Sequence, residues 1–483
     1  MTDVTIMTSA VEVRMLLWIA WFKAVACLRP ACSRVRTYCW MVLVLMGLSI
    51  RTDLAGVTSV VRSLALVPSA YKRLLHHFHS SGLDLARLTE LWTAWCRDAF
   101  PAFCVGTHRV CIADGLKAPK EGRKMPAVKK LHQESANNSK PPFIFGHSFQ
   151  CLSLLTRTTH GHAAAVPLAA RICEGVVWSN RDRRTQLDRL VLLFLSVVPA
   201  LHSAVVLVAD AYYATGKVIL PLLAAGHHLV TRARSNAVAY ESAPQPKRRR
   251  RGRPRLYGKR VRLRDLLATP EAFESVPSPV YGETNVMIAY RCVDLLWRPV
   301  RRPVRFVLVR HPTHGSIILM CTDLSMDPLD VIILYGYRFK IELGFRQALH
   351  VVGTYAYHFW MAAMTPIRRV TGNQHMHHKS ERYRQHVRRK LRAYHSHVQL
   401  SCIVQGLLQY LAIASGTTVW QLFRSWLRTM HTDCPPSELV VAHALRSSLP
   451  EFLSVGPPHP VLAKFLRSHL FQAYDQARQR VAA

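Results

Sequence analysis

Apolar residues recur at intervals of three and four over residues 11–99, which is the period of amphipathic helices. Two apolar runs in this region, 15–28 and 38–50, are shorter than the roughly 20 residues that cross a bilayer, and Lys23 interrupts the first. We therefore expect a small domain of buried helices and no membrane partner.

Two shorter helical segments, 53–66 and 69–78, flank a Val-Pro turn at 67–68. The exposed face expected on the second segment consists of Tyr71, Lys72, Arg73 and His77. Two interpretations stay open for this pair, because a DNA-binding helix-turn-helix and an ordinary bundle with a solvated basic face share this spacing.

Beyond residue 100 the pattern changes to short apolar runs that alternate with helical segments, as in an α/β domain. Strands are expected at 110–113, 143–157, 162–173, 204–209 and 228–232, and helices at 184–198 and 216–225. The run 204–209 is too uniformly apolar to be amphipathic, so we expect a strand that is buried on both faces.

The composition changes abruptly after Arg234. Eleven of the eighteen residues from 247 to 264 are Lys or Arg, and prolines and glycines among them predict a loop or insertion without regular structure. Strands are expected again at 306–310 and 316–321. A long helix is expected from 327 to 352, and the tail beyond Gly353 is mostly helical and basic.

The charge balance points to a polyanionic partner. The chain has 64 Lys and Arg against 28 Asp and Glu, a formal net charge of +36. Nucleic acid fits this balance best, because basic residues gain affinity by releasing the counterions that are condensed on phosphates. The twelve cysteines contain no CxxC pair, which disfavours a zinc ribbon or a disulfide scaffold and favours a reducing compartment.

Acidic residues are scarce, so the carboxylates that end two apolar strands are informative. Asp114 and Asp210 each stand where an expected strand opens into a loop, the usual location of catalytic groups in α/β sheets. Carboxylates brought together there repel each other unless cations lie between them. A third acid, Glu342, lies on the expected long helix between Arg338 and Arg346, and would complete a two-metal site for phosphoryl transfer.

The segment 335–342 resembles the YREK signature of the insertion-sequence transposases of the DDE superfamily, which have a ribonuclease-H-like catalytic domain. Tyr335, Arg338 and Glu342 match three of its four positions, and the fourth, a lysine in the family, is Leu349 here. The resemblance implies that Asp114, Asp210 and Glu342 bind two Mg²⁺ ions, for which Mn²⁺ can substitute. It also implies that Tyr335 and Arg338 hold transposon-end DNA.

Relatives of this kind cut double-stranded DNA at terminal inverted repeats and join the freed 3′ hydroxyl to target DNA. They act as homodimers in a synaptic complex, so the resemblance implies a prokaryotic, cytoplasmic, nucleoid-associated enzyme. Leu349 keeps a second interpretation open: a catalytically decayed DNA-binding protein or transposition repressor of the same fold. A nuclease of this fold that cuts without joining is a third.

The expected fold is α/β, with a ribonuclease-H-like mixed sheet that is interrupted by a β-rich insertion and flanked by helical regions at both ends. The expected domains are a helical DNA-binding domain, the first part of the catalytic domain, the basic insertion, the second part of the catalytic domain, and a helical C-terminal region for DNA contact or dimerisation. Their boundaries are 1–100, 101–235, 236–304, 305–360 and 361–483.

Other basic or aromatic residues extend the expected DNA surface. Arg251 and Arg253, with the glycine between them, resemble an AT-hook core, although nonspecific phosphate contact explains them equally well. Lys130 and Arg346 are further expected DNA contacts. Ordinary packing explains Trp297, Tyr257 and Tyr281 better than base stacking, and a metal role for His375, His377 and His378 is disfavoured because acidic or Cys partners are scarce nearby.

Overall fold

A computed structural model describes residues 10–133, 141–244, 255–455 and 459–469. The first hundred residues form the expected helices, and both apolar runs are buried. These elements are α1 (Ala10–Ala26), a 3₁₀ turn η1 (Arg29–Ala31), α2 (Val35–Ile50), α3 (Val57–Ser63), α4 (Ala70–His79) and α5 (Leu85–Ala99). Helix α3 begins four residues later than predicted, because Asp53 accepts the Ala55 N–H in a local turn and Gly56 has a φ of +60°.

Five strands form the catalytic sheet: β2 (His108–Pro119), β4 (Phe143–Arg157), β5 (Ala163–Ile172), β7 (Val205–Ala209) and β8 (His228–Arg232). Strand β7 pairs in parallel with β2 and β8, while β4 pairs antiparallel with β2 and β5. The order β5-β4-β2-β7-β8 is that of a ribonuclease-H-like mixed sheet, so the predicted fold class is confirmed. Strand β7 is buried along its whole length, as its composition predicts.

Two smaller strands and two helices complete this domain: β1 (Cys104–Val105), β3 (Lys129–His132), α6 (Gln186–Val197) and α7 (Gly216–Ala224). The prediction that the strand ends at Asp114 was wrong. Strand β2 continues to Pro119, because its antiparallel hydrogen bonds to β4 continue as far as Gly146. Asp114 therefore lies in the middle of a strand, at the point where the parallel pairing with β7 stops.

The insertion predicted over 236–304 and the residues after it, up to 321, form one antiparallel extension of the same sheet. Its elements are β9 (Val238–Ser242), β10 (Tyr257–Arg262), the 3₁₀ turns η4 (Leu263–Ala268) and η5 (Pro270–Ala272), β11 (Glu274–Pro277), β12 (Met287–Trp297), β13 (Arg302–His311) and β14 (Gly315–Cys321). Strand β14 pairs with β8, which makes the extension continuous with the catalytic sheet. The predicted absence of regular structure was wrong for 257–262, because β10 pairs with β9 despite its Lys and Arg residues.

The helix predicted over 327–352 is interrupted. It consists of α8 (Pro328–Tyr337), α9 (Lys340–Gln347) and a π-helical turn (Ala348–Val352) that ends at Gly353, whose φ is +64°. Between α8 and α9 the N–H groups of Arg338, Ile341 and Glu342 donate to the carbonyl three residues earlier instead of four. The chain tightens there, and the two helices take separate paths over the sheet.

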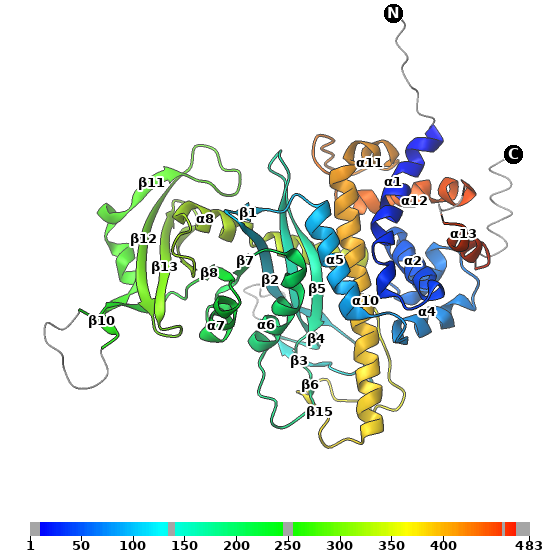
Figure 1. Cartoon of the computed structure of the whole chain (residues 1–483), viewed down its shortest axis with the longest axis horizontal. Helices are drawn as coiled ribbons and strands as arrows, with labels where there is room; N and C mark the ends of the chain where they lie inside the picture. Colours follow the sequence, from blue (N-terminus) through cyan, green and yellow to red (C-terminus); the bar gives the residue numbers. More distant parts are fainter. Residues whose placement is uncertain (1–9, 134–140, 245–254, 456–458, 470–483) are drawn as a thin grey trace, which may run out of the picture.

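The C-terminal part starts with an irregular segment, in which β15 (Gln374–His375) pairs with β6 (Val176–Val177). The helices that follow are α10 (Glu381–Ala414), α11 (Gly416–Leu422), α12 (Glu438–Val455) and α13 (Pro460–Arg467). Helix α10 runs between the sheet and the layer of N- and C-terminal helices (Figure 1). By length and composition it is the one helix of the described residues that could cross a membrane, but 83% of its apolar window is buried inside the protein.

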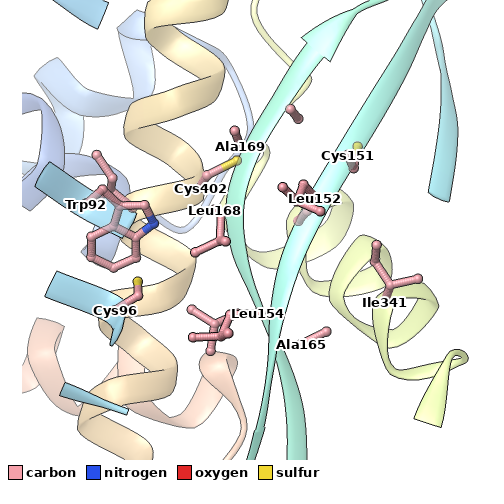
Figure 2. Packing of buried hydrophobic residues seen from close by; sticks show 14 of the residues in the cluster. Trp92, Cys96, Cys151, Leu152, Leu154, Ala165, Leu168, Ala169, Ile341 and Cys402 are labelled. Carbon is pink, nitrogen blue, oxygen red and sulfur yellow. The ribbon is translucent and has the colours of Figure 1, made fainter. Parts of the chain in front are cut away.

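The core lies on both faces of β4 and β5. Figure 2 shows these strands running between α10 on one side and the helix that carries Ile341, α9, on the other. The indole N–H of Trp92 donates to the Pro167 carbonyl at 2.9 Å, which attaches α5 to β5. Because α9 packs against the sheet, it holds Glu342, the residue after Ile341, close to β2.

Candidate active site

Two neighbouring parallel strands carry the two aspartates. Ala113 of β2 is paired with Ala209 of β7, so Asp114 and Asp210, the next residue on each strand, lie side by side. Each carboxylate is oriented by its own backbone: Asp114 accepts the Gly115 N–H at 2.7 Å, and Asp210 accepts the Ala211 N–H at 2.6 Å. The two acids are positioned by sheet pairing and not by flexible loops.

The third acid is brought to the aspartates by α9. Ile341 is 1% exposed against the sheet, and the side-chain amide of Gln405 on α10 donates to the Gly344 carbonyl at 2.9 Å. These contacts fix the helix and leave Glu342 on its solvent side. Arg338 then joins two of the acids, since its Nη1 lies 3.0 Å from Asp114 Oδ2 and its Nη2 lies 2.5 Å from Glu342 Oε1.

The electrostatics of the site are dominated by partly buried negative charge. The pKa of Asp114 is raised to about 6, mainly by burial and also by the charges of Asp210 and Glu342, although the Gly115 N–H and Arg338 oppose the rise. The charges of the three carboxylates therefore influence one another, and two of them, Asp114 and Glu342, share the guanidinium of Arg338. An all-oxygen donor set of this kind suits hard divalent cations such as Mg²⁺.

Several residues with perturbed pKa values lie beside these acids. The hydroxyl of Tyr213 donates to Gln150 at 2.8 Å, and burial, with the nearby charge of Asp114, holds the Tyr213 pKa well above its usual value. Tyr335 on α8 is half-buried, and burial raises its pKa, with further influence from Arg338, Asp210 and Arg232.

Two of these neighbours were missed in the sequence. Gln150 is buried in the middle of β4 opposite Gly115, and Arg232 ends β8 one strand away from Asp210. A charged residue that closes an apolar strand was the available signal for Arg232. Gln150 had no such signal, because a single polar residue in an apolar run does not reveal which residue of the neighbouring strand lies opposite it.

The structure does not bring all the expected DNA contacts to this cluster. Arg346 is exposed at the end of α9, and Leu349 packs against the hydrophobic core. Lys130 pairs with Phe145 on β4, six residues from the partner of Asp114, which is about 20 Å along a strand. Arg251 and Arg253 lie outside the described residues.

The remaining aromatic and histidine residues have separate places. Trp297 is buried, Tyr257 packs beside Tyr240 with ring centroids 5.1 Å apart, and Tyr281 is 61% exposed. In the part of the chain that the structure describes, no group of three closely spaced metal-ligating side chains includes His375, His377 or His378. All twelve cysteines are free.

A basic groove lies in the N-terminal helices, between the start of α2 and α4. Its cationic lining consists of Arg34, Arg36, Lys72, Arg73 and His76. The expectation that His77 is on the exposed face was wrong, because the inward stripe of α4 is Ala70, Leu74, His77 and Phe78, and His76 is exposed instead. The predicted basic face is otherwise present, and it borders a concave surface.

Comparison with known families covers the segment that carries the first two acids. The sequence model of a family described as DDE superfamily endonuclease matches residues 27–278, which is 252 of 483 residues. The match includes Asp114 and Asp210 and ends before Glu342. No curated protein matches the chain.

Proposed function

This chain belongs to the DDE superfamily of endonucleases, and from that premise we propose that it is an insertion-sequence transposase whose catalytic residues are Asp114, Asp210 and Glu342. One observation carries the proposal: Asp114 and Asp210 lie on adjacent parallel strands, and Arg338 links Asp114 to Glu342. Acids from three separate elements therefore converge, whereas a structural role would need only local hydrogen bonds.

Asp114, Asp210 and Glu342 would hold two Mg²⁺ ions, or Mn²⁺ in their place. The fit rests on their oxygen donors and on the raised pKa of Asp114, which comes mainly from burial, with a contribution from the like charges of Asp210 and Glu342. Bound ions of this class supply Lewis-acid stabilisation of the attacking and leaving oxygens in in-line phosphoryl transfer. Arg338 occupies part of the space between the carboxylates, so its guanidinium moves off them when cations are bound.

The residues around the acids would position DNA. Arg338 presents a planar fork that matches a phosphate as well as it matches two carboxylates. Tyr335 and Arg232 lie beside Asp210, and we assign them to the same DNA strand. Arg346, which is exposed one turn beyond Glu342, extends this surface along α9. Lys130, Arg251 and Arg253 would contact DNA farther from the scissile bond.

We assign the transposase steps to the whole chain. The helical region 1–100 would bind transposon-end DNA through the basic groove, and the C-terminal helices would contribute DNA contacts or the interface of a homodimer in the synaptic complex. The reaction would be cleavage at terminal inverted repeats followed by joining to target DNA in a prokaryotic cytoplasm. The net charge of +36 supports binding of both ends and target.

A second candidate is a catalytically decayed DNA-binding protein or transposition repressor, and Leu349 favours it. This residue stands where the signature has lysine, and its partly buried side chain packs against the core. A cleavage assay on terminal DNA separates the two candidates, since a decayed copy would bind that DNA without cutting it.

The decisive experiment compares Asp210→Asn with the wild-type chain on DNA carrying the flanking inverted repeats. We expect Mg²⁺-dependent cleavage to fall by about 10²-fold or more, because a group that organises charge stabilisation in the transition state is lost. DNA affinity should be unchanged. Asp265→Asn, an exposed carboxylate paired with Arg264, is the matched control and should cleave normally. Full activity in Asp210→Asn would refute the assignment, and an inactive wild type that still binds the ends would favour the repressor.

A further inference from the structure

Two turns of the antiparallel extension bring together a carboxylate and two imidazoles. Glu283 lies between β11 and β12, His311 is the last residue of β13, and His314 lies in the turn before β14. One ligand atom from each side chain falls within 4.8 Å of the others. These residues lie outside the carboxylate cluster described above, and the two turns are held next to each other by the strands of the extension.

The separations between these atoms suit a tetrahedral ion. Glu283 Oε2 is 3.0 Å from His311 Nε2, and Glu283 Oε1 is 3.6 Å from His314 Nε2. Ligands bonded to zinc at about 2.0–2.1 Å in tetrahedral geometry stand about 3.3 Å apart, which lies between the two observed distances. The two distances run to different oxygens of the one carboxylate, so an ion bound through a single oxygen needs rotation of the Glu283 and His314 side chains.

The charge environment of Glu283 differs from that of the other acids. In the part of the chain that the structure describes, every other carboxylate that forms an ion pair does so with Arg or Lys, whereas Glu283 pairs with His311 and His314. Hydrogen bonds from His311 and Ser278 lower the pKa of Glu283. The two histidines beside Glu283 are side chains that can ligate a metal ion in their neutral form.

The surrounding residues orient two of the three side chains. Ser278 Oγ donates to Glu283 Oε2 at 2.7 Å, which fixes the carboxylate. Thr313 Oγ1 lies 3.2 Å from Nδ1 of His311. The backbone N–H groups of Thr313 and His314 also donate to this Nδ1 at 3.2 Å, so in the metal-free chain the His311 proton is on Nε2, which donates to Glu283. Metal binding through Nε2 would move that proton to Nδ1, with a shift of the β13–β14 turn that releases the two N–H groups and leaves the Thr313 hydroxyl to accept it. Such an outer hydrogen bond is the usual support of a ligating imidazole.

We propose that Glu283, His311 and His314 bind one divalent transition-metal ion of the zinc class, with water as a fourth ligand on the exposed side of His314. Two nitrogens and one carboxylate oxygen favour zinc, while the all-oxygen cluster at Asp114 suits Mg²⁺. The ion joins the β11–β12 turn to the β13–β14 turn. Both turns line a pocket that also includes Tyr281 and Tyr335, so the ion holds the rim of that pocket in place.

The test measures metal binding directly and does not depend on DNA cleavage. Untagged, full-length protein carrying Asp210→Asn, which weakens the carboxylate cluster, is equilibrated with Zn²⁺, and bound metal is counted after dialysis. We expect one tightly bound zinc per chain. Co²⁺ in its place should give the intense visible absorption of tetrahedral coordination, which an all-oxygen octahedral site does not give.

Two variants and two controls locate the site. Adding His314→Ala or Glu283→Gln should weaken zinc binding by about tenfold to 100-fold or more and abolish the tetrahedral Co²⁺ spectrum. His162→Ala, in an exposed hairpin turn, and His377→Ala should change neither. His314 has a side chain that is 63% exposed, so its loss should leave the metal-free unfolding midpoint unchanged. Equal zinc content with and without Glu283→Gln in the Asp210→Asn protein, no tight zinc at all, or loss of zinc in His377→Ala instead would overturn the proposal.

Discussion

Arg338 connects the elements that form the candidate site. Its guanidinium contacts Asp114 on β2 and Glu342 on α9, so one side chain connects the sheet to the helix that carries the third acid. The sequence places Arg338 four residues before Glu342, which predicts their contact on one helical face. The contact with Asp114, 224 residues earlier, depends on the way α9 is seated on the sheet.

Substitution of Arg338 should therefore separate metal binding from DNA positioning. In Arg338→Gln the competing cation is gone, so we expect half-maximal cleavage at a lower Mg²⁺ concentration. The maximal rate should fall by about 10²-fold, because the phosphate is no longer aligned. Arg338→Lys should not restore the rate, since an ammonium group lacks the planar fork. Arg184→Gln, which removes an exposed arginine paired with Asp182, is the control. An unchanged Mg²⁺ dependence in Arg338→Gln would contradict this role.

At the scale of elements, α2 and α4 build a concave basic surface that neither helix has alone. Arg36 comes from the first turn of α2, and Lys72 comes from the outer face of α4. The inward stripe of α4 packs into the domain, so the cations are left on the groove side. A duplex backbone that lies in this groove would contact both helices.

The groove makes a quantitative prediction for DNA binding. The double variant Arg36→Glu and Lys72→Glu should bind terminal DNA more weakly at low salt. The slope of log K against log salt concentration should become shallower by about 0.9 for each phosphate that the protein no longer neutralises. Lys23→Glu, a charge reversal on α1 outside the groove, should leave the slope unchanged. Equal salt slopes for the double variant and the wild type would show that DNA does not use this surface.

At the scale of the whole molecule, buried histidines lie where the N-terminal helices, the sheet and α10 meet. His397 of α10 packs against Phe78 of α4 and Tyr357, while His147 of β4 packs against Tyr394 of α10. Burial lowers the pKa of His77 to about 4 and the pKa of His147, His395 and His397 to about 3. All four are neutral in the folded chain at pH 7.

This burial predicts acid sensitivity with a defined sign. The unfolded chain takes up protons at these histidines below its pKa of about 6.5, while the folded chain does not until the pH reaches about 3 to 4, so stability is full above pH 6.5 and falls as the pH drops. Each histidine lowers the free energy of unfolding by about 1.4 kcal/mol per pH unit in that window.

Denaturant unfolding between pH 7.5 and 5.5 measures the slope. His147→Gln should reduce it, because one of the four groups no longer titrates, whereas His160→Gln in the exposed hairpin turn should not. A free energy of unfolding that stays constant over this range would mean that these rings reach solvent.

Apolar periodicity was enough to predict most of the local elements, and the sequence also supplied the hypothesis for the site. The bounds of β4 and β8, the burial of β7 and the position of Asp210 directly after it were readable from apolar periodicity, because that periodicity records which face of each segment is buried. The net charge identified the class of partner, and the spacing from Tyr335 to Glu342 pointed to the third acid.

Only the tertiary structure decided which segments meet. Strand β2 passes Asp114 because β4 pairs with it, β10 forms because β9 is available, and Arg338 reaches Asp114 because α9 lies across the sheet. The cluster of Glu283 with His311 and His314 joins two turns in the same way. Apolar periodicity describes one segment at a time. The entropic cost of closing a loop between two segments rises only slowly with the number of residues between them, so the local pattern does not select which segments pair.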